Sequence, residues 1–377
     1  MRSSAPSNKR ARLDRLTSLR FFAALLVVVF HFGNKGLQFG QDAMANAPFW
    51  VQGLAQNGYS SVSFFFVLSG FVLAYNYFSD DSPSGLRVTP RAFWVARAAR
   101  IYPVYIIALG IALPPFCYGT FQAHVIGVDH FAFGLFLVPL MLQAWIPSMS
   151  MTWNSPAWSL SVEALFYASF PLLARWLVRR DAKQLLCVSF VLVGLSSLIR
   201  FLLPQGNEDM QRFAAYFPLL HLPSFLVGVS PGSLFLKGVM AGFPTSVRWF
   251  DLSLCALCAL FALRTKLPHF LYSDACLVPL FAVVIYSGAI AAKFKRSVLD
   301  HPVLVLLGEA SYGLYILHIP LGFWFIWVLK NTLPSSDWSR GGCVCLVFVV
   351  FVTGASVLCY EFVEKPCRRY IQERFML

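Results

Sequence analysis

The stretch Arg20-Phe-Phe-Ala-Ala-Leu-Leu-Val-Val-Val-Phe-His31 decides the fold, because it opens a long apolar run and yet carries two ionisable residues. Arg20 and His31 are eleven positions apart, which is three helical turns plus about 20°, so both side chains lie on one face of a helix. Their separation along the axis is about 16 Å. Ionisable groups inside a bilayer are costly and usually face a partner or a cavity. Two interpretations follow: a membrane anchor with an interhelical hydrogen bond, or a polar site between helices.

Composition predicts a polytopic helical membrane protein. Of the 377 residues, 58% are hydrophobic and only 12% are charged, whereas a soluble domain carries about 25% charged residues. The net charge of +13 sits in short gaps between apolar runs, which fits the orientation rule for membrane helices better than a nucleic-acid surface. The pairs Cys255 with Cys258 and Cys343 with Cys345 lie in apolar runs, so we interpret them as packing residues and expect neither a metal site nor a disulfide framework.

Residues 1–15 are polar and basic and are expected to be disordered and cytoplasmic. The apolar run that follows has no small-residue cleavage site close behind it, so it is interpreted as an uncleaved first transmembrane helix. Eleven apolar segments are candidates for spans: 16–33, 59–78, 101–118, 131–145, 157–174, 184–203, 213–236, 249–263, 270–291, 303–329 and 341–360.

The basic loops fix how many of these segments cross. Loops 79–100 and 175–183 are both rich in arginine, so both are expected inside, and only two crossings fit between them. The weakest segment, 131–145, is therefore interpreted as re-entrant or interfacial, which is allowed where protein buries it. The sequence thus predicts an all-α polytopic membrane protein with about ten transmembrane helices and both termini in the cytoplasm.

Three ionisable residues are expected at one depth in the outer half of this bundle: His31, Glu163 and His318. Tyr312, Tyr315 and His318 recur every three residues and line one side of their helix. A neutral imidazole near a carboxylate suits a general base, because the carboxylate fixes the tautomer and stabilises the imidazolium. Interhelical hydrogen bonds are the alternative, but three such groups together favour a polar cavity.

A second feature is expected at the inner side. Arg97 and Arg100 are one turn apart on one helical face, and Arg20 is predicted at the same depth. Arginine is the preferred group for fork-like binding of phosphate. The three could converge on a polyanionic ligand, or the pair could be ordinary membrane anchors.

These motifs together resemble the membrane acyltransferase 3 family. Its motifs occur in order over almost the whole chain, as Arg20 with His31, 57–70 (ending Phe-Val-Leu-Ser-Gly), 97–103 (Arg-Ala-Ala-Arg-Ile-Tyr-Pro), 158–163 (Trp-Ser-Leu-Ser-Val-Glu), 312–318 and 360–366. The chain departs from the pattern in two places. Thr17-Ser18 stands where many members have Asp-Gly, and Ser61 stands where many have Gly or Ala.

The resemblance implies transfer of an acyl group, commonly acetyl from acetyl-CoA, to a hydroxyl of an exported or cell-envelope carbohydrate at a bacterial inner membrane. Acyl-CoA is then a donor substrate, and no permanently bound cofactor is expected. The implied donor-binding residues are Arg20, Arg97 and Arg100, and the implied catalytic residues are His31 and Glu163. His31 would act as general base or take the acyl group first, and Glu163 would orient it. Tyr315 and His318 are weaker predictions for acceptor contact.

The implied organisation is one transmembrane acyltransferase domain, 16–366, and a cytoplasmic tail, 367–377. Some members carry a fused extracytoplasmic hydrolase-like domain, which this sequence lacks, so we expect direct transfer or a separate partner among envelope-polysaccharide assembly proteins. The main alternative is a transporter or flippase for a sugar or anionic substrate. That alternative favours inverted repeats, and the sequence has none.

Overall fold

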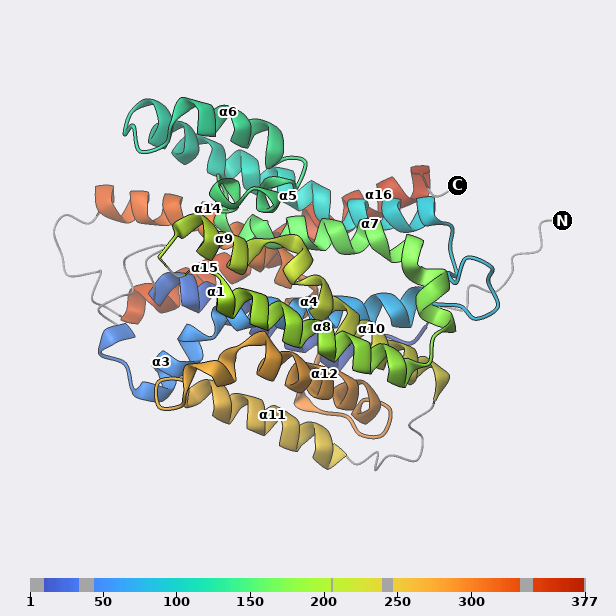
Figure 1. Cartoon of the computed structure of the whole chain (residues 1–377). Helices are drawn as coiled ribbons and strands as arrows, with labels where there is room; N and C mark the ends of the chain where they lie inside the picture. Colours follow the sequence, from blue (N-terminus) through green and yellow to red (C-terminus); the bar gives the residue numbers. More distant parts are fainter. Residues whose placement is uncertain (1–9, 34–43, 205, 239–246, 333–341, 376–377) are drawn as a thin grey trace.

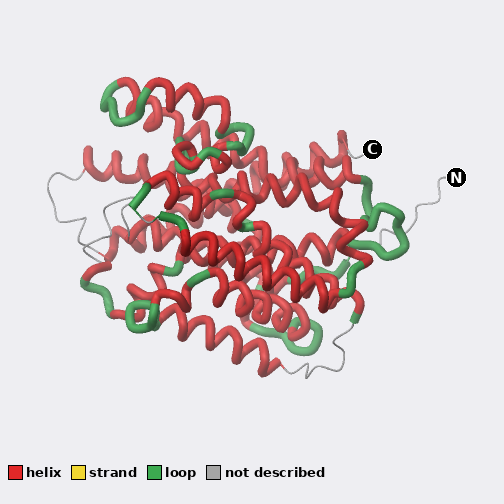
Figure 2. Tube along the Cα trace, in the orientation of Figure 1, coloured by secondary structure: helices red, strands yellow, loops and turns green. Residues whose placement is uncertain are grey.

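The computed structural model of the chain describes residues 10–33, 44–204, 206–238, 247–332 and 342–375. Within these ranges the regular structure consists of α-helices, short 3₁₀ turns and one π-helical turn, and no strand occurs. Figure 2 shows the helices joined by short loops. The predicted all-α class is confirmed.

Nine helices in the described ranges are long and apolar enough to span a membrane. Most of them run side by side across the molecule in Figure 1, which confirms a helical bundle. They are α1 (Asp14–Gly33), α4 (Gly58–Tyr77), α5 (Pro90–Phe121), α7 (Trp158–Arg179), α8 (Ala182–Leu202), α10 (Leu222–Lys237), α12 (Asp274–Ala291), α14 (Ser311–Thr332) and α15 (Gly342–Cys359), which continues into α16 (Lys365–Phe375).

Two shorter helices bear on the predicted number of spans. The segment 249–263 forms α11 (Val247–Ala262), which has 16 residues and is therefore about 24 Å long. The segment 131–145 forms the end of α6 (Val128–Leu137) followed by turns. With ten residues, α6 is about 15 Å long, half the thickness of a hydrocarbon core, as expected for a segment that does not cross.

Several predicted boundaries are corrected. The segment 213–236 is divided into α9 (Glu208–Tyr216) and α10 by a 3₁₀ turn that begins at Pro218. The segment 303–329 is divided into α13 (Pro302–Glu309) and α14. In place of 101–118, α5 begins at Pro90, because the Thr89 side chain accepts a hydrogen bond from the Ala92 amide and caps the helix. A short helix that was not predicted, α3 (Phe49–Gln56), precedes α4.

The predicted disorder of residues 1–15 is wrong for the last residues of this range. Residues 1–9 lie outside the described ranges, but α1 already begins at Asp14. Arg15 is only 1% exposed, because its guanidinium pairs with Asp300 at 2.8 Å and donates to the Lys295 carbonyl at 2.6 Å. At the other end of the chain, the predicted tail 367–377 belongs mostly to α16, which packs against α5.

The centre of the bundle is the contact between α4 and α10. Ser224, Gly228 and Gly232 are four residues apart and form a small-residue stripe on α10, which lets two helix backbones approach closely. A Cβ atom at Gly228 would lie 1.8 Å from the Val67 carbonyl oxygen, and one at Gly70 would lie 2.1 Å from that of Phe225. Gly70, the last residue of the motif 57–70, is therefore required by close helix packing.

Candidate functional site

A cavity of about 100 Å³ lies between α1, α4, α5, α7 and α14. It collects all three arginines predicted to bind a ligand, Arg20 from α1 with Arg97 and Arg100 from α5, and Glu163 from α7. Arg97 and Arg100 share it because a spacing of three residues places them on one helix face. The rest of the polar lining is Ser69, Ser159, Tyr167, Ser311, Tyr312 and Tyr315.

Arg20 and Arg100 have no direct partner among the described residues. Both side chains are half-buried, and neither guanidinium makes a hydrogen bond or a close ion pair there. Their interactions with Glu163 and the other nearby carboxylates are longer-range. A guanidinium inside a helical bundle is costly unless something completes its hydrogen bonding, and these two groups have the donors to bind an anion in this cavity.

Arg97 differs from its two neighbours because aromatic side chains hold it. Its Nη2 donates to the Tyr77 hydroxyl at 2.9 Å. Its Cζ lies 5.3 Å from the ring centroid of Tyr77 and 5.9 Å from that of Tyr167, within the range of cation–π attraction. The orientation of Arg97 is therefore fixed by the protein itself.

Glu163 belongs to the arginine cavity and not to the histidines. Its Oε2 accepts a hydrogen bond from the Tyr167 hydroxyl at 3.0 Å, one turn along the same helix. The predicted orientation of His31 by Glu163 is corrected here, because the ring of His31 is bonded to other groups and Glu163 is on the side of α7 that faces the arginines. The spacing of Tyr167 from Glu163 was visible in the sequence.

Two further carboxylates interact electrostatically with Arg20 and Arg100, and sequence reasoning missed both: Glu309 and Glu364. Glu364 is only 2% exposed, and its Oε2 is buried without a hydrogen-bond partner in the described part of the chain. It ends the π-helical turn Tyr360–Glu364, a type of turn that is frequent at functional sites. The motif at 360–366 gave a signal, but the π turn that sets the depth of Glu364 cannot be read from sequence.

The arginine cavity borders a second one at the end of the bundle where α1 begins. This mouth cavity, about 220 Å³, shares Arg20 and Arg100 with the first cavity. Its lining continues to Arg10, Arg12 and Arg368. A ligand that reaches Arg20 from this end therefore passes a basic mouth, which attracts anions.

The structure brings the two predicted histidines together, outside the arginine cavity. His31 Nδ1 lies 3.2 Å from His318 Nε2, and the ring centroids are 4.9 Å apart. His31 Nδ1 is also 2.9 Å from the Val27 carbonyl oxygen, and His318 Nδ1 is 2.7 Å from that of Tyr315. His318 is 0% exposed, whereas His31 is half-buried.

Tyr315 connects the two polar regions. It lines the arginine cavity, while its ring centroid lies 6.3 Å from that of His318. Its hydroxyl donates to Ser159 Oγ at 2.8 Å or to the Pro156 carbonyl at 3.0 Å, which ties α14 to the start of α7. Of the predicted line of Tyr312, Tyr315 and His318, the two tyrosines face the cavity and the histidine is behind them.

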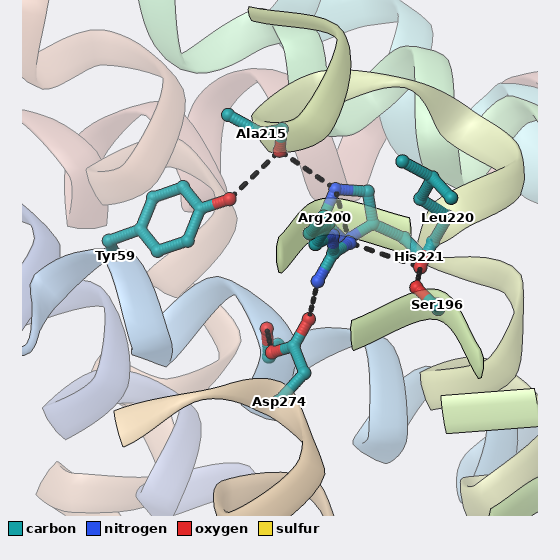
Figure 3. A network of polar contacts seen from close by, with 8 residues as sticks. Tyr59, Ser196, Arg200, Ala215, Leu220, His221 and Asp274 are labelled. Atoms are coloured by element: carbon teal, nitrogen blue, oxygen red, sulfur yellow. Dashed lines mark hydrogen bonds and ion pairs between the residues drawn. The ribbon is translucent and has the colours of Figure 1, made fainter. Parts of the chain in front are cut away.

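Another buried ionic group, which the sequence reasoning did not identify, is shown in Figure 3. It lies where α8 ends and α12 begins. Arg200 from α8 pairs with Asp274 at the start of α12. Arg200 Nη2 also donates to the Leu220 carbonyl at 3.0 Å and lies 3.2 Å from His221 Nδ1. His221 Nε2 in turn donates to the Ala215 carbonyl at 2.9 Å. We call Arg200, His221 and Asp274 the ionic brace, since they connect α8, the start of α10 and α12. In the sequence, this group could have been suspected from Arg200 and Asp274, which are the single charged residues in the apolar segments 184–203 and 270–291.

Comparison with known proteins gives consistent matches. Residues 13–360 match the family model described as an acyltransferase domain. Acyltransferase MdmB of Streptomyces mycarofaciens is 28% identical over 380 residues, covering 96% of this chain and 93% of that protein. The exopolysaccharide production protein ExoZ of Rhizobium meliloti is 29% identical over 316 residues, covering 83% of this chain and 90% of that protein.

A candidate O-acetyltransferase of Staphylococcus aureus (strain COL) is 22% identical over 388 residues, and the match covers 96% of this chain and 58% of that protein. No solved structure gives a significant match.

Proposed function

Since the chain belongs to the acyltransferase family whose model matches residues 13–360, we propose that it is a membrane O-acyltransferase that uses an acyl-CoA donor. The acceptor is a hydroxyl of an exported or cell-envelope carbohydrate, either a polysaccharide or a lipid-linked oligosaccharide. The names of the relatives that produce exopolysaccharide or transfer acetyl groups support this acceptor class and acetyl as the acyl group.

The single observation that carries the donor assignment is the pair Arg20 and Arg100, which face a cavity and have no direct partner among the residues that the structure describes. Coenzyme A offers a pyrophosphate and a 3′-phosphate, which guanidinium groups bind in a fork-like manner. The basic mouth lined by Arg10, Arg12 and Arg368 supports entry of the donor from that end.

The distances along α1 support the same assignment. The pantetheine arm has about thirteen bonds between phosphorus and sulfur and spans about 15 Å, by analogy with an extended peptide chain. Arg20 and His31 are about 16 Å apart along the helix axis. A donor whose phosphates lie at Arg20 therefore has a thioester that reaches the depth of His31.

The chemistry proposed for His31 is general-base catalysis or prior transfer of the acyl group to its imidazole. Glu163 contributes its charge to the cavity that receives the donor, where it balances the guanidinium groups. Tyr315 lies between the arginine cavity and the histidines and is the better placed of the two residues predicted for acceptor contact.

We further propose ten crossings, with the arginine end in the cytoplasm of a bacterial cell and the protein in its inner membrane. The start of α1 and the start of α16 lie at one end of the bundle, since Arg10 and Arg368 line the same mouth. An even number of crossings is then required, and α11 supplies the tenth. Cysteine-accessibility labelling at Val128 and Ser148 should reach both positions from outside the cell. Labelling of one position from each side would contradict this topology.

The experiment that tests the proposed function is mass analysis of envelope glycans from cells with the intact gene, without it, and with the His31→Ala variant. Loss of acetyl mass from a glycan in both altered strains is the expected result. Acetyl mass lost from a secreted small molecule instead would overturn the acceptor class but not the chemistry. Unchanged acylation in every fraction would contradict the enzyme and favour a transporter.

A further inference from the structure

The hydrogen bonds around His318 and His31 determine which nitrogen of each ring carries the proton. A backbone carbonyl oxygen can only accept a hydrogen bond. His318 Nδ1 lies 2.7 Å from the Tyr315 carbonyl oxygen, so this nitrogen is protonated and donates. In the neutral ring, His318 Nε2 then has a free lone pair and can only accept.

The same argument applies to His31. Its Nδ1 lies 2.9 Å from the Val27 carbonyl oxygen and 3.2 Å from His318 Nε2, which are both acceptors. Nδ1 must therefore carry the proton, which it shares between the two. The neutral His31 ring consequently has its lone pair on Nε2, the nitrogen that makes no hydrogen bond with any of the described residues.

We infer that His318 is a positioning residue that, together with the Val27 carbonyl, holds the His31 ring in the Nδ1-protonated tautomer and so makes His31 Nε2 the reactive atom. This inference rests on the proposed function, in which His31 performs the chemistry. His318 is 0% exposed and does not line the cavity, so this role replaces the predicted contact with the acceptor. A histidine that performs catalysis is commonly oriented by a partner on its other nitrogen.

The step that follows is balanced. His31 Nε2 takes the proton of the acceptor hydroxyl while the hydroxyl oxygen attacks the thioester carbonyl carbon. The C–O bond forms, the C–S bond breaks, and CoA leaves as a thiolate that takes the proton from Nε2. During the step the His31 imidazolium donates from Nδ1 to two acceptors, His318 Nε2 and the Val27 carbonyl. If the acyl group is first transferred to His31, the same lone pair on Nε2 attacks the thioester carbonyl carbon, the N–C bond forms, the C–S bond breaks and CoA leaves as a thiolate. The acceptor hydroxyl oxygen then attacks the acyl carbon, the N–C bond breaks, and the hydroxyl proton goes to the CoA thiolate.

Substitutions at position 318 separate positioning from packing. Glutamine can place its amide oxygen near the position of Nε2 and accept from His31, whereas asparagine is one methylene shorter and reproduces only the position of Nδ1. His318→Asn and His318→Ala should lower kcat for transfer of label from radioactive acetyl-CoA to the membranes of gene-deleted cells by at least about a hundredfold, the lower range for disturbed general-base catalysis. His318→Gln should keep at least about ten times more activity than His318→Asn.

KM for acetyl-CoA should stay within about twofold in all three variants, because the phosphate end of the donor is about 16 Å away.

The matched control is His221→Gln, which changes another buried histidine, 1% exposed. It should lower the unfolding temperature in detergent without lowering the kcat of the remaining folded protein. Equal activity in the glutamine, asparagine and alanine variants at position 318, either all high or all low in folded protein, would overturn the inference.

Nitrogen NMR of the wild-type protein labelled with ¹⁵N-histidine tests the tautomer of His31 directly, without any substitution. The expected spectrum has His31 protonated at Nδ1 and unprotonated at Nε2, assigned by loss of the signals in His31→Ala. The opposite tautomer would overturn the inference even if the enzyme transfers acyl groups. Absence of transfer by the wild type with the expected tautomer would instead contradict the proposed function.

Discussion

The arginine cavity and the ionic brace both bury arginine in an apolar bundle, but they differ in how its charge is matched. In the brace, Arg200 is paired with Asp274 and also donates to a backbone carbonyl. In the cavity, Arg20 and Arg100 have no direct partner among the described residues. A buried ion pair changes the free energy of folding little compared with apolar side chains of similar size. A buried charge without a partner destabilises the fold, so it is usually retained where it binds a ligand. Pairing, more than burial, therefore separates the structural charges of this bundle from the functional ones.

The largest expected effect is a loss of folding stability when the ionic brace is broken. Asp274→Ala leaves the Arg200 guanidinium buried without its carboxylate, which should destabilise the fold by about 3–5 kcal/mol. The measurement is thermal unfolding of the purified protein in detergent. The double variant Arg200→Met with Asp274→Leu removes both charges and should recover most of the loss. An unchanged unfolding temperature in Asp274→Ala would show that the brace is not structural.

The second largest effect is expected on turnover, with folding stability unchanged. His31→Ala should lower turnover by at least about a hundredfold, the lower range for loss of a general base, with an unfolding temperature close to that of the wild type. Turnover is measured as transfer of radioactive acetyl from acetyl-CoA to membranes of gene-deleted cells. Near-normal turnover of folded His31→Ala protein would remove His31 from the mechanism.

A smaller effect is expected at Arg97. This residue lines the arginine cavity, as Arg20 and Arg100 do, but it has a protein partner, as Arg200 does, because it donates a hydrogen bond to Tyr77. Tyr77→Phe removes the hydrogen bond that the charged Arg97 guanidinium donates to the Tyr77 hydroxyl, a type of bond worth about 1.5–3 kcal/mol, while the aromatic ring stays under the guanidinium. Because the ring still holds Arg97, only part of this free energy should be lost from donor binding, which should weaken by at most about tenfold, measured by calorimetry with CoA. A loss as large as that of Arg97→Ala would mean that the hydroxyl itself contacts the donor.

Apolar length predicted the helical bundle, and helical spacing predicted that Arg97 and Arg100 share one face. Convergence of Arg20 with this pair was one of two interpretations of the sequence, and the structure places all three around one cavity. The sequence also predicted that Glu163 lies beside His31, which the structure does not show. Counting residues along each helix gives the depth of a side chain in the bundle but not its direction around the helix axis. The rotations of α7 and α14 put Glu163 with the arginines and His318 against His31. Breaks such as those before α10 and α14, and the π turn at Glu364, depend on tertiary packing that a hydropathy pattern does not encode.

The central claim is that the unmatched arginines receive the donor phosphates. It is tested by titrating acetyl-CoA into the detergent-purified wild type, Arg100→Lys and His31→Ala in a calorimeter. Lysine keeps the charge but loses the fork, so Arg100→Lys should weaken binding by about ten- to a hundredfold, the equivalent of roughly 1.5–3 kcal/mol for a charge-assisted hydrogen bond. His31→Ala should bind like the wild type. Folded wild-type protein that binds no acetyl-CoA, or an Arg100→Lys variant that binds as tightly as the wild type, would contradict the claim.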